Sequence, residues 1–107
     1  MRQLSARALA EWLADGERSK PLLLDVREAH EWNIGHLAGA QHMPMHSVPG
    51  RMGELARDAD IVCICHHGGR SAQVAMFLKQ QGYSKIYNLA GGVDAWACEI
   101  DPAMPRY

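Results

Sequence analysis

Two short runs of mostly apolar residues constrain the fold of this chain most. They are Pro21-Leu22-Leu23-Leu24-Asp25-Val26 and Asp60-Ile61-Val62-Cys63-Ile64-Cys65. A strand with one face in water alternates apolar and polar residues, whereas a continuous apolar run is typical of a strand buried on both faces. Such strands occur in parallel sheets that helices cover on both sides. The chain is therefore predicted to be an α/β protein.

Helix and strand signals alternate along the rest of the chain. Ser5 is a suitable N-cap for a first helix that ends near Gly16. A second helix is expected from Ser71 to Gln81, ending at Gly82. Further strands are expected at residues 2–4, 40–43 and 85–88, with short helices within 27–39, within 46–56 and after Gly92 through Trp96. This alternation predicts a mainly parallel sheet with right-handed crossovers.

Size and charge limit the functions that the chain can have. Its 107 residues suit one domain, with a core at about residues 4–97 and a tail at about 98–107. The 11 basic and 12 acidic side chains create no field that would attract nucleic acid or an acidic membrane. The start of the chain lacks the apolar stretch of a signal peptide, and three cysteines are too few for a disulfide-stapled secreted domain. We therefore expect a cytoplasmic protein that binds neither nucleic acid nor membranes.

The loop after the second apolar run has the features of a reactive thiol site. Cys65 ends the predicted strand, and the carboxyl ends of parallel strands are where such sheets bind ligands. Gly68 and Gly69 allow positive φ angles, so the loop can turn its N–H groups inward. Together with a helix N-terminus, those amides would surround the sulfur and favour the thiolate, the reactive form of a thiol. We interpret Cys65 as a nucleophile.

Three motifs together resemble one protein family. Cys65-His66-His67-Gly68-Gly69-Arg70-Ser71 resembles the active-site loop of the rhodanese family of sulfurtransferases. Asp25-Val26-Arg27-Glu28, with Glu31 and then Gly35-His36-Leu37-Ala38-Gly39-Ala40, resembles a second signature of this family. Leu89-Ala90-Gly91-Gly92-Val93-Asp94-Ala95-Trp96 resembles a third. The resemblance extends from Leu4 to about Trp96, and the motifs stand in the expected order.

This resemblance implies a three-layer fold with a five-stranded, mainly parallel sheet and helices on both faces. It also implies that Cys65 takes a sulfane sulfur from thiosulfate or a related donor, holds it as a persulfide and passes it to a thiol or to cyanide. A protein persulfide is a further possible donor or acceptor. The amides of residues 66–71 would stabilise the persulfide anion, and no metal or organic cofactor is required.

The chain departs from the two-domain thiosulfate enzymes of this family in two places. Those enzymes have basic residues after the cysteine, where this chain has His66 and His67, so donor binding is expected to depend on pH. They also have an arginine where this chain has Glu31, and a carboxylate would not help a dianion to bind. Thiosulfate is therefore expected to be a weak substitute for a persulfide or another small donor.

Supporting roles are assigned to other polar residues. Arg70 is expected either to contact an oxyanion or to shape the loop by pairing with Asp25 or Glu28. Asp25 and Arg27 are interpreted as an ion pair that supports the loop. Cys63 is expected to be buried and inert, and Cys98 to be exposed.

Three alternatives stay open at this point. The chain resembles rhodanese-like modules that bind a partner without catalysis, although such modules commonly lose the cysteine. Some phosphatases share the fold, but they separate cysteine and arginine by five residues, whereas four separate Cys65 from Arg70. A metal site would use Cys63, Cys65, His66 and His67, with His42 and His46 nearby, but this arrangement is unlike a structural zinc site.

Overall fold

The computed structural model describes residues 1–107 and contains one five-stranded sheet. Its strands lie in the order β1-β5-β4-β2-β3, and every neighbouring pair is parallel. They are β1 (Arg2–Leu4), β2 (Leu22–Asp25), β3 (Gln41–His42), β4 (Ile61–Ile64) and β5 (Ile86–Leu89). The central strand β4 is the second apolar run of the sequence, so the predicted parallel sheet with buried strands is confirmed.

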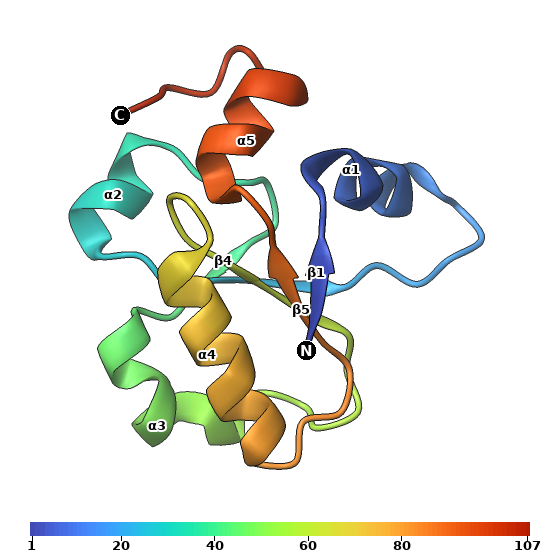
Figure 1. Cartoon of the computed structure of the whole chain (residues 1–107), viewed down its shortest axis with the longest axis vertical. Coiled ribbons are helices and arrows are strands. Elements are labelled where there is room, and N and C mark those ends of the chain that lie inside the picture. Colours follow the sequence, from blue (N-terminus) through green and yellow to red (C-terminus); the bar gives the residue numbers. More distant parts are fainter.

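Helices cover both faces of this sheet, as Figure 1 shows. α1 (Ala6–Ala14) and α5 (Gly92–Glu99) lie above the sheet in this view, and α3 (Val48–Arg51) and α4 (Gly69–Gln80) lie below it. The short 3-10 helices η1 (Met45–Ser47) and η2 (Met52–Glu54) flank α3, and α2 (Ala29–Ile34) lies to one side. The three-layer fold implied by the sequence motifs is confirmed.

The side chains of β4 divide between two buried clusters. Successive side chains of a strand point to opposite faces of the sheet. Ile61, Cys63 and Cys65 accordingly belong to the cluster under α4, whereas Val62 and Ile64 pack with residues of α1 and α5. The strand places Cys65 on the α4 side, where the following loop and helix cover it.

The start of α1 agrees with the prediction from the sequence, whereas the start of α4 differs from it. Ser5 caps α1 as predicted, because its Oγ accepts a hydrogen bond from Ala8 N at 3.0 Å. The helix predicted from Ser71 starts two residues earlier, at Gly69. Gly68, with a φ of 107°, is its N-cap, so Gly69 and Arg70 already belong to the first turn of α4.

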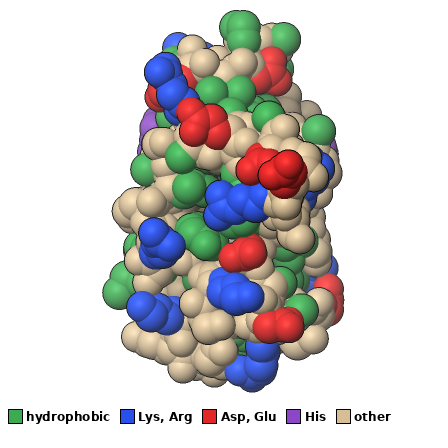
Figure 2. All heavy atoms as spheres, turned by 90° about the vertical axis from the view of Figure 1, so that its right-hand side faces the viewer, with side chains coloured by type: hydrophobic (Ala, Val, Ile, Leu, Met, Phe, Trp, Pro, Cys, Tyr) green, Lys and Arg blue, Asp and Glu red, His purple; other side chains and the backbone are tan.

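Charges of both signs are mixed on the surface. Figure 2 shows Lys and Arg side chains interspersed with Asp and Glu on the face that it presents. None of the helices is long and apolar enough to cross a membrane.

Candidate active site

Cys65 directly follows β4 and is buried, with 2% of its surface exposed. Gly68 N donates a hydrogen bond to Cys65 Sγ at 3.1 Å. Ser71 Oγ lies 3.2 Å from the same sulfur and 2.5 Å from Asn88 Oδ1. The sulfur also lies at the N-terminal end of the twelve-residue helix α4, whose dipole favours negative charge there. The surroundings of Sγ are therefore those that stabilise a thiolate or a persulfide anion.

Gly68 shapes the loop around the sulfur. Its positive φ is a conformation that L side chains rarely adopt, and it lets the N–H point at Sγ. Asn88 Nδ2 donates to Gly68 O at 3.1 Å and so holds the turn from β5. The positive φ that the sequence predicts at Gly69 as well is wrong, because Gly69 is helical. Among the amides of residues 66–71, only that of Gly68 donates to the sulfur.

The start of α5 holds the loop from the other side. Val93 N donates to Cys65 O at 2.9 Å, and Asp94 N donates to His66 O at 3.1 Å. Gly92 makes this approach possible, since a Cβ atom built on it would lie 2.3 Å from Cys65 O. Its φ of 58° also disfavours other residues. The Gly91-Gly92 motif therefore acts through close contact with the backbone of the cysteine.

Arg70 pairs with a carboxylate other than the two that the sequence predicts. Its guanidinium makes two hydrogen bonds to Glu31 of α2, Nη1 to Oε1 at 2.7 Å and Nη2 to Oε2 at 2.8 Å. The expected pairing with Asp25 or Glu28 is wrong. Asp25 pairs with Arg27, and Glu28 caps α2. Chiefly through these bonds, Arg70 holds the pKa of Glu31 far below its ordinary value, and Glu31 raises the pKa of Arg70.

The interpretation of Asp25 and Arg27 as an ion pair is confirmed. Arg27 Nη2 lies 2.7 Å from Asp25 Oδ2, and both side chains are fully buried. Arg27 also donates to the carbonyl oxygens of Glu31 and Gly35 and to the hydroxyl of Tyr107. The pair thus joins the end of β2 to the middle of α2 and to its C-cap, Gly35.

His66 and His67 lie over the loop with their rings stacked. The ring centroids are 3.9 Å apart, and Tyr107 stacks on His66 at 3.8 Å. Burial, followed by the neighbouring His67, lowers the pKa of His66. His66 Nε2 is buried without a hydrogen-bond partner, which a neutral ring tolerates better than a charged one.

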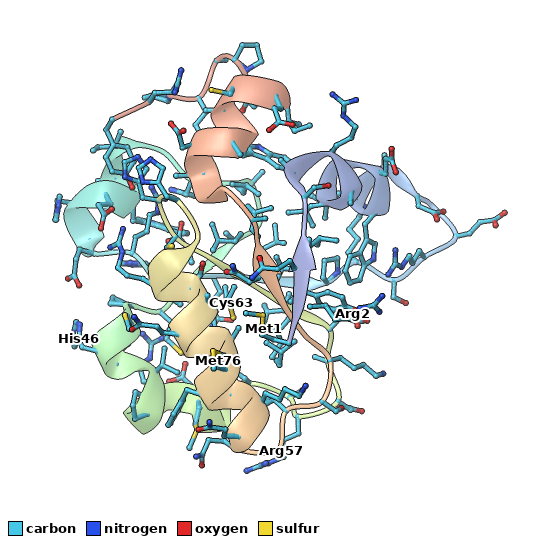
Figure 3. The ribbon with its side chains drawn as sticks, viewed as in Figure 1. Met1, Arg2, His46, Arg57, Cys63 and Met76 are labelled. Atoms are coloured by element: carbon cyan, nitrogen blue, oxygen red, sulfur yellow. The ribbon has the colours of Figure 1, made fainter.

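The group with the spacing of metal ligands is His66, His67 and Asp94, whose ligand atoms lie within 4.8 Å of one another. His42 is not a member of this group, and its Nε2 hydrogen-bonds to Arg27 O. Figure 3 shows His46 at the outer edge of the molecule, beside α3.

The other two cysteines behave as the sequence indicates. Cys63 is fully buried, and this burial raises the pKa of its thiol to about 12. Cys98 is exposed, and all three cysteines are free thiols.

Sequence reasoning missed two contacts of the site. The sequence places Asn88 in a strand without indicating its contact, although a polar residue in a buried strand is itself a signal for a specific role. Nothing in the sequence indicates the role of Tyr107, because its contacts span 76 and 80 residues of sequence.

The two cavities of the molecule lie away from Cys65, one beside β1 and the other between η1 and α4.

Comparison with known proteins agrees with this geometry. Residues 5–99 match the profile described as the rhodanese-like domain. A protein of Allochromatium vinosum named sulfurtransferase is 41% identical over 95 residues, which cover 89% of this chain and 87% of that protein. The thiosulfate sulfurtransferase GlpE of Pseudomonas aeruginosa is 35% identical over 74 residues, covering 69% of this chain and 67% of GlpE. Other relatives are longer, and the chain spans 30% and 26% of two of them.

A solved structure shows the same fold over almost the whole chain. The crystal structure of SSP1007 from Staphylococcus saprophyticus superposes with a TM-score of 0.85 at 32% identity. The match covers 94% of this chain and 97% of that one. Together with the match over residues 5–99, these likenesses establish that the chain belongs to the rhodanese-like sulfurtransferase family.

Proposed function

We propose that the protein transfers sulfane sulfur through a persulfide on Cys65. The observation that carries this proposal is the position of Cys65 Sγ, held by Gly68 N and Ser71 Oγ at the start of α4. Gly68 N and the N-terminal end of α4 stabilise negative charge on sulfur, and Ser71 Oγ can add a hydrogen bond when its single proton turns from Asn88 Oδ1 to the sulfur. Negative charge on sulfur is present both in the attacking thiolate and in the persulfide product.

The reaction has two displacement steps. In the first, the Cys65 thiolate attacks the sulfane sulfur of the donor, and the donor's S–S bond breaks with its electron pair on the leaving group. That group is sulfite when the donor is thiosulfate. In the second, a thiolate or cyanide attacks the terminal sulfur of the persulfide and releases the Cys65 thiolate. Neither step needs a metal or an organic cofactor. The name of the relative GlpE supports thiosulfate as one donor.

The pairing of Arg70 with Glu31 argues against the phosphatase alternative. A phosphatase on this fold uses an arginine to bind phosphate, but the Arg70 guanidinium is bound end-on by both oxygens of Glu31. We therefore expect negligible hydrolysis of aryl phosphates.

Intact-protein mass spectrometry after thiosulfate treatment tests the proposal. The wild-type protein is expected to gain the mass of one sulfur atom, which cyanide removes. Cys65→Ser should abolish the gain, whereas the matched variant Cys98→Ser should retain it. Sulfur found on Cys63 or Cys98 of the wild-type protein, or no gain with any sulfane donor, would contradict the assignment.

A further inference from the structure

The cations around the active-site loop are all paired with carboxylates. Arg70 pairs with Glu31, and Arg27 pairs with Asp25. Arg106 donates two hydrogen bonds to Asp94 Oδ1, at 3.2 and 3.1 Å. Three arginines and three carboxylates leave no net charge. Of the two loop histidines, His67 lies 4.0 Å from Asp94, and the lowered pKa of His66 keeps its ring neutral at pH 7.

Each carboxylate oxygen of Glu31 accepts two hydrogen bonds, and these four bonds hold the side chain in its pairing position. Oε1 accepts from Arg70 Nη1 and from Glu28 N, which closes the capping box of α2. Oε2 accepts from Arg70 Nη2 and from the hydroxyl of Tyr107 at 2.7 Å. A carboxylate with four such donors and little solvent exposure cannot easily swing away from Arg70.

Tyr107 completes this arrangement from a distant part of the chain. Its hydroxyl donates to Glu31 Oε2 and accepts from Arg27 Nη1 at 3.1 Å. The end of the chain lies beside α2 and the active-site loop (Figure 1). One hydroxyl therefore links the Arg27 and Arg70 ion pairs and fixes Glu31 between them.

We propose that Glu31, held by Tyr107, is a specificity-determining residue that keeps Arg70 from binding the sulfonate group of thiosulfate and thereby favours organic persulfides over thiosulfate. This inference rests on the proposed sulfur transfer at Cys65. Thiosulfate is a dianion whose sulfonate end is best bound by a free guanidinium or ammonium group, and the guanidinium nearest the loop is already neutralised. The sulfane sulfur of an alkyl persulfide needs only access to Cys65 Sγ.

The transfer from such a donor balances without an added oxidant or reductant. The Cys65 thiolate attacks the terminal sulfur of R–S–S⁻, the donor's S–S bond breaks, and R–S⁻ leaves as Cys65–S–S⁻ forms. The same number of thiolate charges is present before and after the step, so no further co-reactant is involved.

Loading of Cys65 from two donors tests the role of Glu31. The probes are thiosulfate and the persulfide of N-acetylcysteine methyl ester, whose organic part is uncharged. Initial rates of sulfur gain are measured by intact mass at increasing donor concentration. Glu31→Gln removes the charge that neutralises Arg70, so the half-saturating thiosulfate concentration should fall about tenfold, the effect of one hydrogen bond to a charged group. Half-saturation by the alkyl persulfide should stay unchanged.

Three further variants separate this role from a general loss of structure. Tyr107→Phe keeps the ring on His66 but removes the hydroxyl, so it should shift thiosulfate half-saturation in the same direction and by less. Tyr87→Phe is the matched control, because its hydroxyl contacts Asp60 away from the loop, and it should change neither donor. A double variant, Glu31→Gln with Arg70→Lys, should lose part of the gain.

The outcomes distinguish the inference from the proposed function. If wild-type Cys65 takes no sulfur from either donor, the proposed function fails and the inference fails with it. If Cys65 is loaded but Glu31→Gln shifts both donors equally, or shifts neither, the proposed function stands and the role of Glu31 is disproved.

Discussion

At the scale of single residues, Ser71 is the side chain whose removal tests the sulfur site most directly. Its hydroxyl lies within hydrogen-bond distance of both Cys65 Sγ and Asn88 Oδ1. Its single proton can serve only one of these acceptors at a time. Donated to the charged sulfur, it contributes roughly 1.5–3 kcal/mol, so Ser71→Ala should slow persulfide formation about tenfold or more. Single-turnover loading from a sulfane donor measures this rate. Ser47→Ala removes a hydroxyl that bonds only to Pro44 O, and it should load at the wild-type rate. Equal loading in both variants would mean that Ser71 does not assist the sulfur.

The two thiols outside the sulfur site, Cys63 and Cys98, are also expected to differ sharply in their reactivity. Cys63 is fully buried, and its pKa is raised to about 12, so it stays a protonated thiol at pH 8. Cys98 is exposed. Iodoacetamide treatment of the folded protein at pH 8, followed by peptide mass spectrometry, should therefore modify Cys98 and leave Cys63 intact until the protein unfolds. Early modification of Cys63 would show that the sheet opens beneath α4.

At the scale of elements, the contact between α5 and the loop after β4 depends on a glycine. Gly92→Ala would place a Cβ atom 2.3 Å from Cys65 O and force a side chain into a left-handed conformation. The start of α5 would have to move, which breaks the bonds from Val93 N and Asp94 N to the loop. We expect the free energy of unfolding to fall by about 2 kcal/mol or more, as is typical of strain at a special φ combined with lost hydrogen bonds.

Urea unfolding of Gly92→Ala and a matched glycine variant measures this cost. Gly50 lies on the exposed surface of α3, with open space where its Cβ would be. Gly50→Ala should therefore leave the midpoint unchanged or raise it slightly, since alanine is favoured over glycine in helices by roughly 0.5–1 kcal/mol. A Gly92→Ala midpoint as high as that of Gly50→Ala would contradict the contact.

The elements of the fold could be predicted from the sequence, but the side-chain contacts between elements could not. Local patterns of apolar residues and caps identified β4, α4 and the start of α1, because each depends on neighbours within a few residues. The partner of Arg70 depends instead on how α2 packs across the loop, over 39 residues of sequence. The sequence left Asp25 and Glu28 open as partners, and only the packing of α2 selects Glu31 instead.

At the scale of the whole molecule, one carboxylate connects α2, α4 and the end of the chain. Glu31 accepts from Arg70 of α4 and from Tyr107. The end of the chain is further attached where Met104 packs on the core, where Pro105 approaches Gly35, and where Arg106 pairs with Asp94. Loss of charge on Glu31 should thus loosen several parts of the molecule at once, and acid is the simplest way to remove that charge.

The stability of the fold in acid should therefore depend on Glu31. Hydrogen bonds from Arg70, followed by those from Tyr107 and Glu28 N, hold the pKa of Glu31 far below its ordinary value of 4.5 in the folded protein. The unfolded chain then binds more protons than the folded one as the pH falls. The stabilisation from Glu31 is fully present above about pH 4.5 and is lost progressively below it.

Urea unfolding between pH 7 and pH 2.5 should show a free energy of unfolding that declines in the wild-type protein below pH 4.5. Glu31→Gln should start lower at pH 7 and decline less steeply. Glu54→Gln removes a carboxylate from the exposed pair with Arg51, and exposed pairs contribute little, so its slope should match the wild type. If Glu31→Gln keeps the full wild-type slope below pH 4.5, the acid sensitivity arises elsewhere, and Glu31 does not link α2 and α4 as the structure indicates.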